Sequence, residues 1–288
     1  MKRVLVTGAN GQLGTCIKDA AVGFTNLECV FATKSELNIA DKDSVENYFE
    51  KNHFDYCINT AAYTNVEKAE SEEEQAFLIN AEAAKHLAKT CKKHDVVLLH
   101  VSTDYVFDGT KNEPYIETDI TNPINVYGAS KLKGEAYIQK LCEKHFIVRT
   151  SWLYSQYGHN FLNSMMKYAE QGKPLTITTE QTGTPTNAND LAQVLLKCVD
   201  SNKDGYGLYH FSNSGKATWY DFAKEILEQT GLIEKTKLAQ TDYYRTFAKR
   251  PVYSILNTSK IENVVGVKTI DWKESLKALL APKNNTLH

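Results

Sequence analysis

The chain has 288 residues, of which 42% are hydrophobic and 24% are charged, and its formal net charge is −2. This composition is ordinary for a globular protein, and the lack of a basic excess argues against nucleic acid as a partner. No apolar stretch approaches the roughly 18 residues that a membrane span requires. We therefore expect neither a membrane partner nor, since the chain leads directly into a predicted strand, a signal peptide.

Short apolar runs alternate with helical patterns in the first half of the chain. The predicted strands cover 2–8, 28–33, 54–62, 96–103 and 146–152. The predicted helices start near Gln12 or cover 41–52, 72–93 and 127–143. The run at 96–103 is almost entirely apolar, as expected of a strand covered on both faces. This alternation predicts an α/β fold with a doubly wound parallel sheet of Rossmann type.

The pattern loosens after about residue 155. Helices are predicted near 159–171, 190–201, 219–230 and 272–280, separated by short strands such as 207–212. We predict a dinucleotide-binding domain over residues 1–155. Residues 156–288 should form a smaller, mainly substrate-binding lobe, with some segments returning to the first domain.

Six cysteines lie at positions 16, 29, 57, 91, 142 and 198, and none forms a CxxC pair. Most of them lie inside apolar runs, which favours reduced structural thiols over a disulfide framework. This cysteine usage predicts a cytoplasmic protein. The sequence shows no ligand cluster at metal spacing, so we expect no metal site.

The first predicted strand ends in the motif GxxGxxG, formed by Gly8, Gly11 and Gly14. At such a position the backbone must turn sharply and its amides must approach a ligand closely, and glycine does both without steric cost. The following helix presents free N–H groups and a partial positive charge to a pyrophosphate. The motif therefore predicts a dinucleotide cofactor.

The end of the second strand, "FATKSE", bears on which dinucleotide is bound. An acidic residue commonly holds the ribose 2′-OH of NAD at this place, but the chain has Ala32, Thr33 and Lys34 there. A lysine and hydroxyls suit a 2′-phosphate, so we expect NADPH. Glu36 lies close by in the sequence, which leaves NADH possible.

The segment "YGASK" places Tyr127 and Lys131 on one face of a helix. A lysine cation can lower the pKa of the phenol toward neutrality and bind the nicotinamide ribose, while the phenol gives a proton to a carbonyl. Thr103 adds a hydroxyl at the carboxyl end of the fourth strand, where open α/β sheets bind ligands. A second pair, Tyr220 and Lys224, lies outside the dinucleotide half, and we interpret Tyr220 as a surface or packing residue.

Longer segments carry a family resemblance. The motif "TGANGQLG" resembles the extended branch of the short-chain dehydrogenase/reductase superfamily. Further segments, in order along nearly the whole chain, resemble the dTDP-4-dehydrorhamnose reductase family: "AAYTNVEKAE" (61–70), "STDYVFDG" (102–109), "NVYGASKLKGE" (125–135), "RTSWLY" (149–154), "NF" (160–161), "GTPTNANDLA" (183–192) and "RP" (250–251). This resemblance implies NAD(P)H-dependent reduction of the C4 ketone of dTDP-4-dehydro-L-rhamnose to dTDP-L-rhamnose, in nucleotide-sugar and polysaccharide precursor biosynthesis.

The motifs and the resemblance together imply roles for individual residues. The residues expected to bind the cofactor are Gly8, Gly11, Gln12, Leu13, Gly14, Lys34, Asn38, Ile39, Ala61, Ala62, Tyr63, Ser102, Tyr127 and Lys131. The residues expected to bind the substrate are Thr103, Asp104, Trp152 and Arg250. Among these, Tyr127 would donate the proton, Lys131 would hold the ribose, and Thr103 would polarise the ketone. The alternatives to these roles are core packing at a strand end for Trp152 and a surface salt bridge for Arg250.

Two other classes of function stay open. One is another NAD(P)-dependent nucleotide-sugar reductase or epimerase; a 4,6-dehydratase would need a glutamate after Asp104, where the chain has Tyr105. The other is a non-catalytic regulatory subunit of the methionine adenosyltransferase type, which resembles the same reductases. The set Thr103, Tyr127 and Lys131 favours catalysis. We expect a nucleotide-sugar substrate and a homodimer.

Overall fold

The computed structural model describes residues 1–201 and 205–281. Its centre is a six-stranded sheet in the order β10-β5-β4-β3-β1-β2, in which every neighbouring pair is parallel. The strands are β1 (Lys2–Thr7), β2 (Leu27–Ala32), β3 (Tyr56–Asn59), β4 (Val97–Thr103), β5 (His145–Thr150) and β10 (Gly207–His210). The predicted doubly wound parallel sheet is confirmed.

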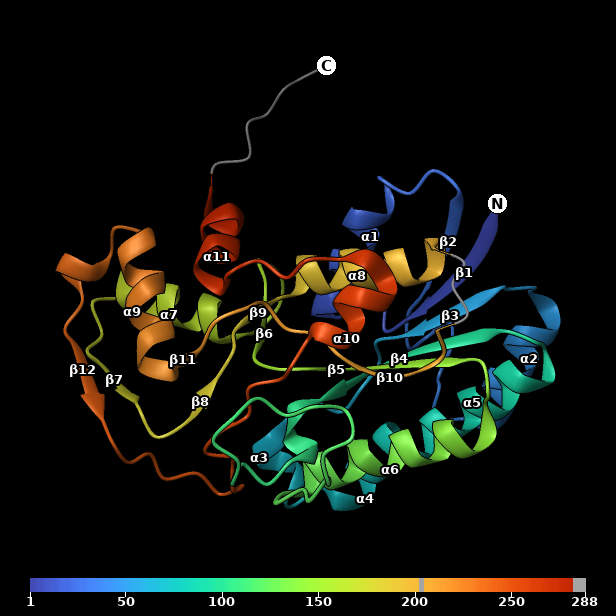
Figure 1. Cartoon of the computed structure of the whole chain (residues 1–288), viewed down its shortest axis with the longest axis horizontal. Helices are drawn as coiled ribbons and strands as arrows, with labels where there is room; N and C mark the ends of the chain where they lie inside the picture. Colours follow the sequence, from blue (N-terminus) through green and yellow to red (C-terminus); the bar gives the residue numbers. More distant parts are fainter. Residues whose placement is uncertain (202–204, 282–288) are drawn as a thin grey trace.

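Helices cover both faces of this sheet (Figure 1). On one face α1 (Gln12–Ala21) packs against α8 (Ala188–Asp200), and on the other lie α2 (Lys42–Lys51), α5 (Ala83–Lys93) and α6 (Val126–Leu141). Apolar side chains from each face of the sheet form a separate core with the helices of that face. Because β4 contributes to both cores, its first three residues, Val97–Leu99, are all apolar.

The segment predicted as one helix over 72–93 is interrupted. It consists of α4 (Glu73–Phe77), a wide π-helical turn (Leu78–Glu82) and α5. The turn brings the Asn80 carbonyl against α6 at Gly134, where an added Cβ would lie only 2.2 Å from the carbonyl oxygen. Such turns are frequent at functional sites, and this one lies beside the loop that follows β3.

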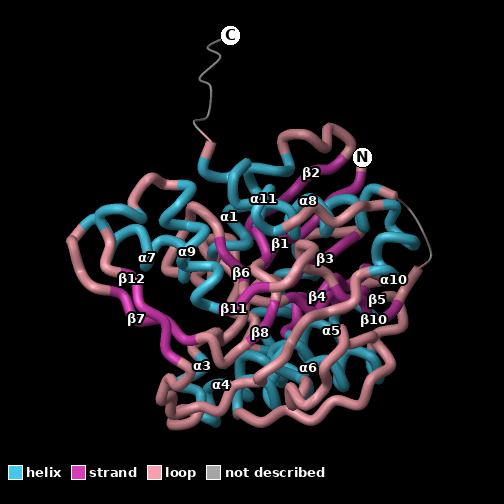
Figure 2. The backbone as a smooth tube through the Cα atoms, turned by 60° about the vertical axis from the view of Figure 1, so that its left-hand side comes forward, coloured by secondary structure: helices cyan, strands magenta, loops and turns pink. Residues whose placement is uncertain are grey.

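A second lobe lies beside the sheet, and its β7–β12 pair forms the far edge of the molecule (Figure 2). Its helices share their own apolar core, which includes Phe222 and Trp272. Its elements are β6 (Leu153–Tyr154), α7 (Phe161–Glu170), β7 (Leu175–Thr178), β8 (Thr182–Gly183), β9 (Thr186–Asn187), β11 (Ala217–Thr218), α9 (Trp219–Gln229), β12 (Leu238–Thr241) and α11 (Trp272–Leu280). The short helices α3 (Val66–Ala69) and α10 (Ser259–Ile261) lie outside this core.

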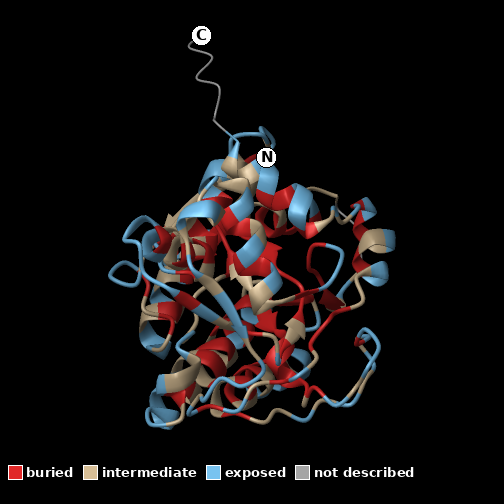
Figure 3. Cartoon of the chain, turned by 90° about the vertical axis from the view of Figure 1, so that its left-hand side faces the viewer, coloured by how far each residue is buried: buried red, intermediate tan, exposed pale blue. Residues whose placement is uncertain are grey.

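Two segments from the later half of the chain belong to the central sheet and its cover. β10 pairs with β5, and α8 packs on α1. The division of the chain at residue 155 stays a prediction. Buried residues fill the interior of both lobes, whereas exposed residues line the outer loops (Figure 3).

Two further predictions concern the state of the cysteines and the presence of membrane-spanning helices. All six cysteines are free, and all but the half-buried Cys29 are buried. Within residues 1–201 and 205–281, none of the helices has the length and apolar character needed to cross a bilayer.

Candidate active site

A cavity of about 1030 Å³ lies at the carboxyl ends of the strands. In the sheet, β1 lies between β2 and β3, so the chain order reverses beside β1, which is where open α/β sheets bind ligands. The predicted residues that line the cavity are Gly8, Gly11, Gln12, Leu13, Lys34, Asn38, Ile39, Ala61, Ala62, Ser102, Thr103, Asp104, Tyr127, Lys131, Trp152 and Arg250. Gly14 and Tyr63 do not line it.

The glycine motif forms the turn between β1 and α1. Gly8 has a φ of +70°, and a Cβ there would lie 2.8 Å from the backbone nitrogen of Ala61. Gly11 precedes the first turn of α1 and has no side chain to cover its N–H groups. Gly14 has a packing role, because a Cβ there would lie 2.4 Å from the Gly8 carbonyl oxygen. The turn therefore leaves a helix N-terminus open toward the cavity.

An acidic and a basic residue, Glu36 and Lys34, follow the end of β2. The Glu36 carboxylate accepts hydrogen bonds from the backbone N–H and the hydroxyl of Thr33, at 2.8 and 2.7 Å. These bonds lower the pKa of Glu36. The carboxylate is thus engaged with Thr33, while the exposed Lys34 lines the cavity.

Contacts within and beside the loop after β3 explain why Tyr63 does not line the cavity, although it was expected to bind the cofactor. Its hydroxyl donates to Glu72 at 2.6 Å, which holds the ring away from the cavity. Its backbone N–H and carbonyl both bond to the side-chain amide of Asn80, which also donates to Ser130 of α6. Tyr63 therefore fixes the loop through its backbone, while Ala61 and Ala62 line the cavity.

The first turn of α6 positions Tyr127. The Asn125 side chain accepts the N–H of Gly128 at 2.7 Å and donates to the Lys249 carbonyl at 2.8 Å. A Cβ at Gly128 would lie only 2.1 Å from the Tyr105 carbonyl oxygen. Glycine at this position thus allows α6 to approach the turn that follows β4, which brings Tyr127 within hydrogen-bonding distance of Thr103.

The acidity of Tyr127 differs from the expectation. Burial raises the pKa of its phenol to about 12, although the hydrogen bond with Thr103 acts in the opposite direction. Lys131 is not among the groups that lower this pKa, and its Nζ atom donates to the Val101 carbonyl at 2.6 Å. Burial also lowers the pKa of Lys131 to about 8. The prediction of a phenol shifted toward neutrality by Lys131 is therefore wrong for this structure.

Asp104 adds a second titratable group at the cavity wall. Burial raises the pKa of its carboxyl to about 7, while hydrogen bonds with Ser254 and Thr103 act to lower it. The Thr103 hydroxyl lies 3.1 Å from the Asp104 Oδ1 atom, and the Oδ2 atom is buried. With its pKa near neutrality, this carboxyl can either accept or donate a hydrogen bond.

The wall on the second-lobe side is aromatic. Trp152 has a φ of +43°, unusual for a residue with a side chain, and its ring stacks on Trp219 with centroids 3.7 Å apart. Both rings line the cavity. The sequence analysis missed Trp219, because it starts a helix of the second lobe and no local motif connects it with Trp152.

The loop before α7 is a second part of the cavity wall that the sequence analysis missed. Gly158, His159 and Asn160 line the cavity. The Asn160 amide donates to the side-chain oxygen of Gln12 at 2.8 Å. This bond connects the glycine motif with the second lobe. Asn160 starts the segment "NF" (160–161) that carries the family resemblance, but the sequence analysis assigned no role to it or to the two residues before it.

Arg250 lines the cavity but already has an ion-pair partner. Its guanidinium lies 2.8 Å from Glu67, whose carboxylate also accepts the backbone N–H groups of Phe247 and Ala248. The salt bridge and the cavity position that the sequence left as alternatives therefore coexist. In the described part of the chain, no group of three or more His, Cys, Asp or Glu side chains could hold a metal ion.

Known proteins are similar to this chain over nearly its whole length. A family model described as the RmlD substrate binding domain matches residues 1–285. The chain is 38% identical over 294 residues to a dTDP-4-dehydrorhamnose reductase of Aggregatibacter actinomycetemcomitans, covering 98% of this chain and 99% of the relative.

Two solved structures are similar over nearly the whole chain. A dTDP-4-dehydrorhamnose reductase of Clostridium acetobutylicum is 39% identical with a TM-score of 0.90, covering 96% of this chain and 98% of that one. One from Bacillus anthracis, solved in complex with NADP, is 34% identical with a TM-score of 0.91 and the same coverage. The family model, the relative and the two solved structures agree over nearly the whole chain, so the chain belongs to the dTDP-4-dehydrorhamnose reductase family.

Proposed function

We propose that the chain reduces the C4 ketone of dTDP-4-dehydro-L-rhamnose to dTDP-L-rhamnose with NADPH. The observation that carries this proposal is the meeting of Tyr127, Thr103 and Lys131 in one cavity with the open N-terminus of α1. A dinucleotide site and a proton donor in one cavity suit the reduction of a carbonyl. The identity of the sugar nucleotide is inferred from the names of the similar proteins.

The shape of the glycine turn fits a dinucleotide. At Gly8 the backbone lies too close to the loop after β3 for any side chain, and Gly11 leaves the first N–H groups of α1 uncovered. These features suit a pyrophosphate. When bound, the cofactor supplies the hydride.

The residues of the chain would then transfer the proton and bind the cofactor ribose and the substrate. Thr103 would donate a hydrogen bond to the ketone, and Tyr127 would transfer its hydroxyl proton to the oxygen as negative charge develops there. Lys131 would hold the cofactor ribose. Trp152 and Trp219 would form an apolar wall that excludes water, and Arg250 would meet the substrate diphosphate.

A turnover assay tests this proposal. The protein should oxidise NADPH when the 4-keto sugar nucleotide is added, in amounts equal to the dTDP-L-rhamnose formed. An epimerase would change the sugar without net oxidation of the cofactor. If the protein bound the cofactor, produced no turnover and instead captured methionine adenosyltransferase in a pull-down, the regulatory alternative would replace this proposal.

The choice between NADPH and NADH leads to a prediction about Lys34. An exposed lysine beside a 2′-phosphate should favour NADPH by about tenfold, or ~1.4 kcal/mol, because solvent screens the contact. Lys34→Ala should bring the KM values for the two cofactors close to parity by raising that for NADPH alone. Lys51→Ala, an exposed lysine outside the cavity, is the control and should leave the ratio unchanged. An unchanged ratio in Lys34→Ala would contradict this role.

We also propose that the chain acts in the cytoplasm, which its six free cysteines support. The homodimer stays a prediction, and light scattering of the purified protein tests it.

A further inference from the structure

A buried histidine lies directly behind the proposed ribose-binding lysine. His100 belongs to β4 and is 1% exposed. Its Nε2 atom lies 3.4 Å from the Lys131 Nζ atom, and its Nδ1 atom lies 3.0 Å from the side-chain nitrogen of Asn59. The proposed mechanism gives this ring no part, although it touches the lysine on which that mechanism depends.

The surroundings of Asn59 determine which ring nitrogen carries the proton. The backbone N–H of Ala61 points to one terminal atom of the Asn59 side chain at 3.2 Å, and the hydroxyl of Thr7 points to the same atom at 2.7 Å. A backbone N–H can only donate, so this atom must be the amide oxygen. The other terminal atom is therefore the NH₂ group, which donates to Nδ1 of His100.

The tautomer of His100 follows from this arrangement. Since Nδ1 accepts a hydrogen bond from Asn59, the proton of the neutral ring lies on Nε2. Burial and the neighbouring Lys131 both lower the pKa of His100, so the ring stays neutral. The Nε2–H group thus points toward Lys131.

This contact discriminates between the two forms of Lys131. An ammonium group has donors only, so it meets the Nε2–H group of His100 without forming a hydrogen bond. A neutral amine can accept that hydrogen with its lone pair and still donate to the Val101 carbonyl. Glu135, one turn along α6, is the charged neighbour that favours the ammonium form.

We propose that His100 is a positioning residue for Lys131. The Ala61 backbone orients the Asn59 amide, and this amide keeps the proton of the His100 ring on Nε2. The Nε2–H group then favours the neutral amine of Lys131. The consequence for turnover rests on the proposed function. Tyr127 gives up one proton in each cycle. The ammonium form of Lys131, one helical turn away, can return a proton to the phenolate, and the neutral amine that this leaves, which His100 stabilises, takes a new proton from water in the cavity. Ala61 lines the cavity, so the same chain of contacts connects the cofactor side with Lys131.

The first test reads the tautomer directly. Histidine labelled with ¹⁵N in the ring and long-range proton–nitrogen NMR report which nitrogen carries a proton, and His100→Leu assigns the signals among the eight histidines. In the unmodified protein, Nε2 should be protonated and Nδ1 unprotonated across the neutral pH range. A proton on Nδ1, alone or together with Nε2, would overturn the proposal.

The second test reverses the tautomer. In Asn59→Asp the introduced carboxylate can keep the bonds from Ala61 and Thr7 but must accept from Nδ1–H, which turns Nε2 into an acceptor for the Lys131 ammonium. The pKa of Lys131, followed by NMR of ¹⁵N-labelled lysine, should rise by about one unit, a tenfold change in proton affinity. The signal is assigned with Lys131→Arg.

A double-variant cycle separates the ring from the new charge. The carboxylate acts directly on the pKa of Lys131 both with His100 present and in His100→Leu. Only the difference between the two pKa shifts is therefore caused by the imidazole ring. Equal shifts in both backgrounds would overturn the proposal. If Asn59→Asp does not fold, the tautomer of His100 in the unmodified protein still tests the proposal.

Both tests use the free protein without cofactor or substrate. If both tests failed, the reductase proposal would be unaffected. If the protein had no reductase activity, the tautomer of His100 could still be measured.

Discussion

Tyr127→Phe should lower kcat for reduction of the 4-keto sugar nucleotide by about 10²–10⁴-fold, the usual effect of losing a positioned acid. The substitution removes one hydroxyl, and the ring can keep its edge-on contact with Tyr105 at 5.9 Å. The fold should therefore persist, and KM for the cofactor should change little. Steady-state kinetics together with a thermal unfolding curve measure both properties.

Tyr220→Phe provides the matched control. Tyr220 also precedes a lysine by four residues on a helix, but it does not line the cavity. Its loss should leave kcat within a few-fold of the unmodified value. If Tyr127→Phe turned over at nearly the unmodified rate, or if Tyr220→Phe were the damaging substitution, the assignment of the proton donor would be wrong.

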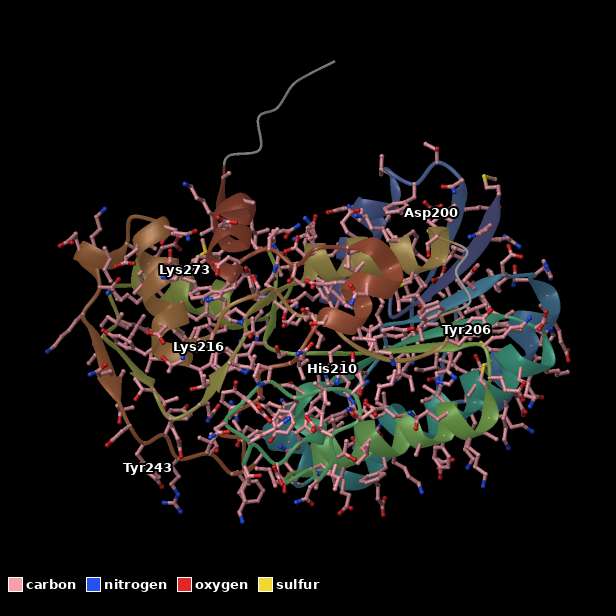
Figure 4. All side chains as sticks on the ribbon, in the orientation of Figure 1. Asp200, Tyr206, His210, Lys216, Tyr243 and Lys273 are labelled. Atoms are coloured by element: carbon pink, nitrogen blue, oxygen red, sulfur yellow. The ribbon has the colours of Figure 1, made fainter. Side chains whose placement is uncertain are left out.

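Arg149→Met should lower the free energy of unfolding by about 3–5 kcal/mol, the usual cost of removing one partner from a buried ion pair. Arg149 lies 2.7 Å from Glu135, and their side chains are only 3% and 2% exposed. Its guanidinium also approaches His210, which Figure 4 places near the middle of the molecule. Without Arg149, a buried carboxylate lacks its counter-charge. Urea denaturation measures the difference.

Two controls accompany this prediction. Lys92→Met removes one partner of the exposed pair Lys92–Glu143, and it should leave the unfolding midpoint almost unchanged. Arg149→Met combined with Glu135→Leu removes both charges and should recover part of the lost stability. A loss in Arg149→Met no larger than that in Lys92→Met would contradict the role given to the buried pair.

The strands and most helices could be predicted because their signals are local. The run 96–99 is apolar on both faces, and capping residues such as Asp41 mark where helices start. The order of strands in the sheet depends on contacts distant in the sequence, and so does the π-helical turn over Leu78–Glu82. That turn depends on how closely Asn80 can approach Gly134, a residue more than 50 positions away.

The same distinction applies to the site. Tyr127, Lys131 and Thr103 lie in short motifs, so the sequence alone could indicate their chemistry, and the structure places all three at one cavity. Trp219 could not be found, since the fold brings it to the cavity from a helix far along the chain, where it stacks on Trp152. The acidity of Tyr127 was predicted in the wrong direction because burial, which raises its pKa, is a property of the folded chain.

The contribution of β10 to the central sheet has a consequence for how the protein is made. Thr150 ends β5, and its sheet partner β10 ends at His210, 60 residues later. At ribosomal rates of about 5–20 residues per second, the edge of β5 waits roughly 3–12 s for its partner. During that time an open strand edge and the α8-binding face of α1 are uncovered on the nascent chain, and both invite aggregation. We therefore expect that synthesis of this protein depends on chaperones that bind the chain before residue 210 has emerged.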